Sequence, residues 1–300
     1  MDMTQNKCCR HGASLRRRRR RHRKILRFII FSYSIIAVAV FVAVGSRMIT
    51  SGDGGTNKYD VEAGNNTYDN AVIENSKISE KNKIQNNQSM LDDIMNSTQY
   101  PKQLQELALK NEEALEFVYD YPAEHVKEHT IDLTEEASMD SVPLFVQWDK
   151  RWGYEKYSGN FFAASGCGPT TLSMVVVYLT HNREASPIAV AKYSKEAGYS
   201  VDGSGSSWTL ISEGCMHYGV KAKAVALDES RMKAELDEGH PIVVNVGPGD
   251  FTDTGHFMVI TGYDDEGFSI NDPNSIEKSG KRWLFRNISS QIRAVWSMYV

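Results

Sequence analysis

The sequence predicts an α+β fold in which a helical part precedes an antiparallel sheet. Residues 167–239 contain helix candidates with clear start and stop signals, whereas the chain after Pro241 consists of short β-branched or aromatic runs between Gly, Asp and Asn. Helices followed by strands are typical of the α+β class. A third observation is the run 172–179, which is apolar on every face and therefore predicts a buried helix.

Cys167 lies directly before this buried helix, between two glycines and ahead of Pro169. Proline is favoured at the first position of a helix, so we expect the helix to begin near Pro169 and to end near His181. The thiol would then face unpaired N–H groups and the positive end of the helix dipole, which lower its pKa and make it a nucleophile. The glycines would let a substrate strand approach closely. The alternative is a buried structural cysteine. The flanking glycines and Pro169 argue against it, because they indicate the boundary of an element and not a core position.

Residues that typically begin or end helices and strands predict the remaining elements of the globular part. Polar N-caps and terminating glycines indicate three more helices: Ser186-Pro187 to Gly198, Ser206 or Ser207 past Trp208 and Cys215 to Gly219, and Asp228 or Ser230 to Gly239. Strands are predicted at 242–246, 257–263, 268–270, 283–285 and 295–300. A dense group of aromatic residues either lines a cleft or covers the edge of a core: Trp148, Trp152, Tyr154 and Tyr157.

Charge is divided unevenly along the chain. Residues 1–50 carry 12 basic residues and one acidic residue, while the remainder carries 22 basic and 37 acidic residues, within a net charge of −4. A basic run at 16–24 directly precedes the uncharged apolar segment 28–44, which reaches the lower limit for crossing a bilayer. This order predicts a membrane anchor with its basic flank in the cytoplasm, and it argues against nucleic-acid binding. A cleaved signal peptide is the alternative, but its apolar core is usually shorter.

We therefore expect a basic cytoplasmic tail at 1–24, a transmembrane signal-anchor at 25–46 and an extracellular remainder. Residues 47–89 are polar and show no apolar period, so they predict a disordered linker. Residues 90–138 carry apolar side chains at helical spacing, broken at Tyr100-Pro101. They predict short helices that pack on the globular domain at 139–300.

A cysteine nucleophile needs a base, and histidine is suited because its pKa lies near neutrality. His256 follows a long Gly- and Asp-rich loop and opens an apolar strand, although a structural histidine is the alternative reading. Asp272 ends the next strand, so antiparallel pairing would place its carboxylate beside His256, with Asn271 as the fallback orienter. Gln147, in the segment expected beside the helix tip, is a candidate oxyanion donor together with the N–H of Cys167.

Beyond the anchor the sequence has two cysteines, Cys167 and Cys215. A disulfide between them is the main structural alternative to a nucleophile. The sequence contains no zinc-protease, Cys-x-x-Cys, phosphate-loop or calcium-loop motif, so no cofactor and no metal are expected.

Taken together, these residues resemble cysteine peptidase family 39, in the papain-like clan. The resemblance rests on Val142-Pro143-Leu144, Gln147-Trp148-Asp149, Gly166-Cys167-Gly168-Pro169, Gly205 with Trp208, Gly247-Pro248-Gly249-Asp250-Phe251, Gly255-His256-Phe257 and Asn271-Asp272-Pro273-Asn274-Ser275. It implies a papain-like fold, with Cys167 as nucleophile, His256 as base, Asp272 as orienter and Gln147 as oxyanion donor.

The segment from Tyr100-Pro101 to Tyr121-Pro122 is similar to one that precedes this domain in membrane-anchored relatives from Gram-positive bacteria. The bacteriocin-processing members of the family join the peptidase to a transporter and keep it in the cytoplasm. This sequence shows no transporter and predicts an extracellular domain, so their leader-peptide substrate does not carry over.

The sequence thus predicts a membrane-anchored extracellular thiol hydrolase that cleaves peptide or amide bonds. Surface or secreted peptides and the peptide cross-bridges of the cell wall are the expected substrates. Two alternatives stay open. One is a non-catalytic module that binds peptide or wall in the same cleft, and the other is a structural protein held by a Cys167–Cys215 bridge.

Overall fold

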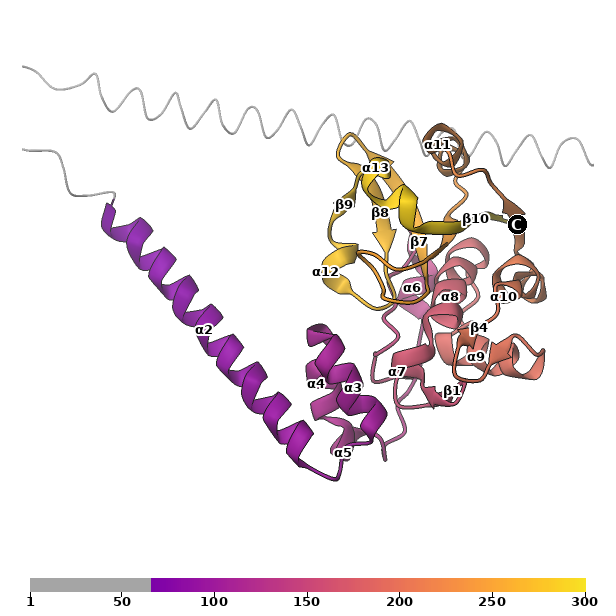
Figure 1. Cartoon of the computed structure of the whole chain (residues 1–300). Coiled ribbons are helices and arrows are strands. Elements are labelled where there is room, and N and C mark those ends of the chain that lie inside the picture. The colour runs from indigo at the N-terminus through magenta and orange to yellow at the C-terminus, as the bar shows by residue number, and fades with distance from the viewer. Residues whose placement is uncertain (1–65) are drawn as a thin grey trace, which may run out of the picture. The chain divides into compact units, whose positions relative to one another are not determined.

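The computed structural model describes residues 66–300, which are built around a six-stranded antiparallel sheet (Figure 1). The strand order is β5-β10-β6-β7-β8-β9. The strands are β5 (Lys221–Ala224), β6 (Ile242–Val246), β7 (His256–Asp264), β8 (Gly267–Asn271), β9 (Arg282–Trp283) and β10 (Ile292–Tyr299). Two small ribbons pair β1 (Lys156–Tyr157) with β2 (Asn160–Phe161) and β3 (Ser200–Val201) with β4 (Gly205–Ser206). The predicted α+β class and antiparallel sheet are confirmed.

Helices cover both faces of this sheet because its central strands are apolar on both sides. On one face α8 (Cys167–Thr180) packs on β7, and α9 (Pro187–Glu196) packs on α8. On the other face α11 (Glu229–Asp237) contacts β6 and β7. Successive strand residues alternate between the two cores: Val243, Phe257 and Val259 lie in the core with α8, and Ile242, Val244 and Met258 in the core with α11.

The predicted buried helix is α8, in which every residue from 168 to 177 is buried. It begins at Cys167, two residues before Pro169, because Gly166 occupies the N-cap position. It ends at Thr180, where His181 adopts a left-handed conformation with φ 57°. Cys167 is therefore the first residue of the helix rather than a residue ahead of it.

Three further differences separate the structure from the sequence prediction. The helix expected to run past Trp208 to Gly219 is divided into α10 (Thr209–Ser212) and the 3-10 helix η2 (Gly214–Tyr218), since Glu213 leaves helical geometry with φ −128°. Strand β5 was not predicted because its alternating Lys and Ala residues give no apolar run. The strand expected at 283–285 ends at Trp283, and α13 (Phe285–Ile288) follows.

The structure describes only part of the N-terminal segment for which the sequence predicts a tail, an anchor and a linker. The expected tail at 1–24 and anchor at 25–46 lie outside the described residues, and so does 47–65 of the expected linker. Within residues 66–300, no helix has both the length and the apolar character needed to cross a membrane. From Asn66 onward the prediction of a disordered linker is wrong, because α2 (Asn66–Asn96) is a helix. Its polar sequence contains no Gly or Pro to interrupt helical hydrogen bonding.

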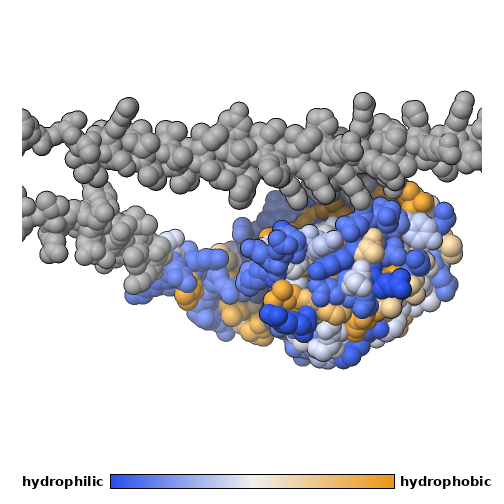
Figure 2. All heavy atoms as spheres, turned by 90° about the horizontal axis from the view of Figure 1, so that it is seen from above, coloured by the Kyte–Doolittle hydropathy of each residue, from blue (hydrophilic) through white to orange (hydrophobic). Residues whose placement is uncertain are grey.

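Short helices follow between α2 and the sheet domain: α3 (Lys102–Lys110), η1 (Glu112–Ala114), α4 (Leu115–Tyr119), α5 (Tyr121–Glu124) and α6 (Thr134–Ser138). Their apolar side chains share a core with Phe161 and Ala163 of the following domain. The ring of Phe117 stacks on Tyr154 with centroids 4.2 Å apart. The coloured surface in Figure 2 is mostly hydrophilic, with hydrophobic residues in small separate groups. The helical segment is thus packed on the domain and belongs to the same compact unit, residues 71–300.

Candidate active site

Cys167 stands at the N-terminus of α8 and lines a cleft of about 710 Å³. The side chain is half-buried. Burial alone would raise the pKa of the thiol, but the hydrogen bond with His256, the charge of that ring and the N–H groups of Phe257 and Gly168 together lower it. These surroundings are typical of a thiol held as the reactive thiolate.

The two glycines beside Cys167 make room for the protein's own side chains. A Cβ on Gly168 would lie 2.5 Å from Ser206 Oγ, and one on Gly166 would lie 2.6 Å from the Phe162 ring. Both contacts are closer than any real Cβ tolerates. This corrects the expectation that the glycines leave room for a substrate strand, since internal packing already occupies both positions.

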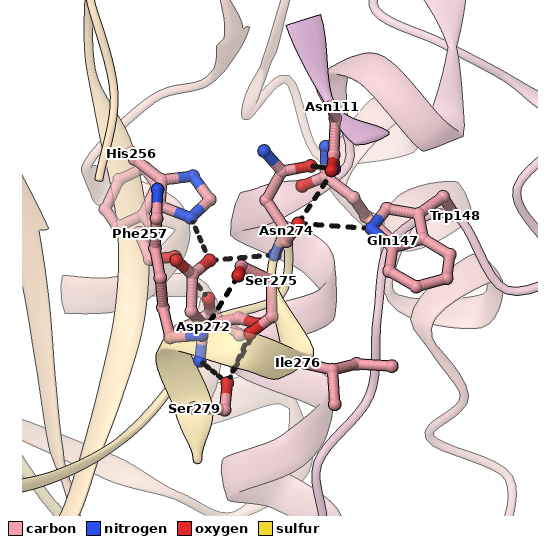
Figure 3. A network of polar contacts seen from close by, with 12 residues as sticks. Asn111, Gln147, Trp148, His256, Phe257, Asp272, Asn274, Ser275, Ile276 and Ser279 are labelled. Atoms are coloured by element: carbon pink, nitrogen blue, oxygen red, sulfur yellow. Dashed lines mark hydrogen bonds and ion pairs between the residues drawn. The ribbon is translucent and has the colours of Figure 1, made fainter. Parts of the chain in front are cut away.

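His256 and Asp272 form a buried ion pair (Figure 3). His256 opens β7 and Asp272 directly follows β8, so the antiparallel pairing of these strands brings the two side chains together. His256 Nε2 lies 2.7 Å from Asp272 Oδ1, and the side chains are 7% and 0% exposed. Asn271, the fallback orienter, instead donates its Nδ2 to the carbonyl oxygens of Val142 and Pro143. Of the two candidates, Asp272 is therefore the one that contacts the imidazole.

This ion pair changes the proton affinity of the histidine. Burial lowers the pKa of His256, but the charge of Asp272, its hydrogen bond and the neighbouring Cys167 thiol raise that pKa to about 10. Because Nε2 faces Asp272, Nδ1 is the ring nitrogen left for the thiol. A raised histidine pKa beside a lowered cysteine pKa places the shared proton on the imidazole. The site therefore favours a thiolate–imidazolium pair.

Gln147 is buried beside α7 (Phe162–Ser165), the turn that leads into α8. Its Nε2 donates to the carbonyl of Ala163 at 2.7 Å, and its backbone N–H donates to the carbonyl of Pro273 at 2.7 Å. An amide nitrogen carries two hydrogens, so one side-chain N–H is left. Gln147 thus connects the turn before Cys167 with the loop after Asp272. Its role as an oxyanion donor stays a prediction.

Several residues that line the cleft were not predicted as site residues, among them Trp208, Asn245 and Arg293. Trp208, which is 48% exposed, was predicted as a helix residue and as part of the family resemblance, and Asn245 only as a strand residue. Arg293 was assigned to neither the site nor a strand, although it lies in β10. Trp148 and Trp152, for which the sequence left open a cleft or the edge of a core, pack in cores. Asn245 could have been predicted as a cleft residue from its position near the C-terminal end of β6, because the loop before His256 begins there.

The alternative of a disulfide is wrong, because Cys167 and Cys215 are both free thiols. Cys215 is buried in the core with α8, and burial raises its pKa to about 11. It is therefore an unreactive structural cysteine. Residues 66–300 contain no group of three or more His, Cys, Asp or Glu side chains placed to hold a metal ion.

The pH dependence of Cys167 alkylation tests the ion pair. The lowered thiol pKa should make Cys167 react with iodoacetamide at a pH where ordinary cysteines do not. Asp272→Asn removes the charge that raises the pKa of His256, so the imidazole holds its proton less tightly and the thiol pKa rises. We expect the alkylation curve of this variant to move to higher pH by about one unit or more, measured by peptide mapping and mass spectrometry.

Cys215 is the internal control for this measurement, because its burial should keep it unreactive over the same pH range. An Asp272→Asn curve that coincides with the wild-type curve would show that the carboxylate does not control the thiol.

The chain was compared with known families and solved structures. The peptidase domain of Streptococcus ComA, a bi-functional ABC transporter involved in a quorum sensing pathway, aligns with a TM-score of 0.39 and 19% identity, covering 53% of this chain and 96% of that domain. A putative C39-like peptidase from Bacillus anthracis aligns with a TM-score of 0.33 and 18% identity, covering 53% and 95%. No curated protein matches the chain. The sequence profile of the Peptidase C39-like family matches residues 139–300, more than half of the chain, and the protein therefore belongs to that family.

Proposed function

We propose that this protein is a cysteine peptidase, a thiol hydrolase that cleaves peptide or amide bonds with Cys167, His256 and Asp272. The observation that carries this proposal is the buried His256–Asp272 pair beside a thiol of lowered pKa that lines an open cleft. Membership of the Peptidase C39-like family supports the same chemistry.

In the proposed reaction the Cys167 thiolate attacks the substrate carbonyl carbon and forms a tetrahedral oxyanion. The N–H of Cys167, at the N-terminus of α8, and the remaining side-chain N–H of Gln147 are the candidate donors to that oxygen. The His256 imidazolium gives its proton to the leaving amine as the C–N bond breaks, which leaves an acyl-enzyme. Water, deprotonated by His256, then attacks the thioester, releases the carboxylic acid and restores the thiolate–imidazolium pair.

Substitution of the nucleophile tests the reaction. Cys167→Ala should lower the hydrolysis of a peptide library, including cell-wall cross-bridge peptides, by about 10³-fold or more, as for other covalent nucleophiles. Cleavage is followed by mass spectrometry of the products. Cys215→Ala is the matched control, since it removes the other described thiol and should keep activity as long as the variant stays folded.

Equal cleavage by wild type and Cys167→Ala would exclude a thiol mechanism. A wild-type protein that binds peptides, cleaves none and leaves Cys167 unreactive toward iodoacetamide would instead be a non-catalytic binding module on the same fold.

We also propose that residues 25–46 anchor the peptidase to the membrane with the C-terminal domain outside the cell. The uncharged apolar run 28–44 and the basic run that precedes it support this orientation. In a Gram-positive host, the full chain should sediment with membranes, and protease added to intact cells should digest the domain at 139–300. A domain that is digested only after the cells are permeabilised would show that the proposed orientation is reversed.

A further inference from the structure

The candidate active-site cleft is lined by one basic side chain, Arg293, and by no Asp or Glu. Apart from the Cys167 thiol, the other lining residues are glycines, hydroxyl and amide residues and a few apolar side chains. A cleft with a single fixed positive charge discriminates among peptides by their charge at one position.

A bulge in β10 turns Arg293 toward this cleft. The register between β10 and β6 shifts between Ile292 and Ala294, which leaves Arg293 as the extra residue. Its guanidinium lies over Gly247, where a Cβ would be only 2.7 Å from Nε. The absence of a side chain at Gly247 therefore makes the space that the guanidinium occupies.

The charge of Arg293 is not neutralised within the described part of the chain. The side chain is exposed, and no carboxylate of residues 66–300 pairs with it. On the loop that precedes His256, Asp250 is engaged by Gln291, whose Nε2 lies 2.6 Å from Asp250 Oδ2. A planar guanidinium with free donors is suited to bind a carboxylate with two parallel hydrogen bonds.

The strand register gives the distance from this charge to the proposed chemistry. Ile292, Val246 and His256 form one row across β10, β6 and β7. Neighbouring strands are about 4.8 Å apart, so β10 lies roughly 10 Å from β7. An extended peptide advances about 3.3 Å per residue. Arg293 is therefore within reach of a substrate side chain about two or three residues from the bond at Cys167.

We propose that Arg293 forms a carboxylate-binding subsite that selects peptides with Asp or Glu two or three residues from the cleaved bond. The proposal names the substrate class of the peptidase proposed above and rests on that function. The guanidinium binds the acidic side chain and thereby fixes the register of the peptide along the cleft.

Binding of a peptide array to Cys167→Ala tests this subsite without requiring turnover. The array contains pairs of peptides that differ by Glu or Gln at each position along the sequence. We expect Glu to bind about tenfold more tightly than Gln at one position, as for a charge-assisted bond worth about 1.4 kcal/mol. Arg293→Gln in the same background should abolish the difference, and Arg293→Lys should keep part of it. Arg286→Gln, which removes an exposed charge on α13 outside the cleft, should change nothing.

Equal binding of Glu and Gln peptides, or a Glu preference that survives Arg293→Gln, would overturn the subsite. Failure of the wild-type enzyme to hydrolyse any peptide would contradict the peptidase proposal alone, because array binding is measured on a variant without the nucleophile.

The helical segment before the family domain reaches the loop that follows Asp272. Glu113 lies in η1, outside the matched residues 139–300. Its carboxylate accepts the N–H groups of Ile276 at 2.7 Å and Glu277 at 3.0 Å and the hydroxyl of Ser275. These groups open α12 (Ile276–Ser279), so Glu113 holds the start of that turn from another element.

A second contact continues directly to the ion pair (Figure 3). Asn111 Nδ2 donates to the carbonyl of Asn274 at 2.9 Å, and Trp148 Nε1 donates to the same oxygen at 3.2 Å. The N–H of Asn274 donates to Asp272 Oδ1 at 2.8 Å. This is the oxygen that faces His256 Nε2. A continuous chain of hydrogen bonds therefore connects the helical segment with the imidazole.

From these contacts, which are independent of Arg293, we infer that Glu113 and Asn111 are positioning residues for Asp272. They hold the loop at 273–276 in the conformation in which the N–H of Asn274 donates to Asp272 Oδ1. Without them the carboxylate can rotate away from His256, and its effect on the imidazole and the thiol decreases. The helical segment is thereby part of the machinery of the site.

The alkylation curve of Glu113→Gln tests this inference, because a side chain of the same shape loses the charge and one acceptor oxygen. We expect the curve of Cys167 to move to higher pH, with a rate about tenfold lower at pH 6, corresponding to one pKa unit. Glu112→Gln is the matched control. It makes the same change on the neighbouring residue, whose carboxylate accepts a hydrogen bond from Asn87 and, among residues 66–300, from no group of the Asp272 loop, and it should leave the curve in place.

A Glu113→Gln protein with reduced thermal stability and an unmoved alkylation curve would assign Glu113 a merely structural role and overturn the inference. This readout needs no hydrolysis, so its outcome is separate from that of the peptidase proposal.

Discussion

Burial of the Asp272 carboxylate is the constraint on which the rest of the site depends. A carboxylate with no solvent exposure stays ionised only beside a cation or several hydrogen-bond donors. Asp272 receives one N–H, from Asn274, and among the described residues its Oδ2 has no hydrogen-bond partner. The His256 ring is the other group that contacts this carboxylate, and the contact raises the pKa of the imidazole. The contact with that ring lowers the pKa of the Cys167 thiol in turn, so the thiol pKa depends on the burial of a carboxylate one residue beyond a strand end.

The sheet and α8 must be held in register for this coupling to exist, because the thiol and the imidazole belong to different elements. Thr171, four residues after Cys167, donates its hydroxyl to the carbonyl of Phe257, the residue after His256, at 3.1 Å. Both residues are buried in the core that α8 shares with β7. The apolar faces of the helix and the strand therefore stabilise the fold and fix the distance between the Cys167 thiol and the His256 imidazole.

The parts of the site that the sequence could predict depend on local signals. A helix start marks Cys167, and the order of two antiparallel strands is sufficient to bring Asp272 beside His256. The parts that it could not predict depend on tertiary contacts. Glu113 forms hydrogen bonds with residues more than 160 positions later in the sequence. The orientation of Arg293 results from a β-bulge that the local sequence does not predict. The glycines beside Cys167 show the same limit, since only the structure reveals that Ser206 and Phe162 fill their space.

The cleft and the contacts that hold the Asp272 carboxylate lie on different parts of this domain. The lining of the cleft includes residues 203–206, the ends of the loop before His256 and Arg293, and none of these lining residues makes a hydrogen bond to the Asp272 carboxylate. The carboxylate is held instead from the helical segment and the loop at 273–276. Under the proposed function, substitutions in the cleft would therefore alter which peptide binds while the ion pair is preserved. Conversely, the boundary of the family match at residue 139 omits Glu113 and Asn111, which contact the loop after Asp272. A fragment cut at that boundary would lose these contacts to the loop that carries Asp272.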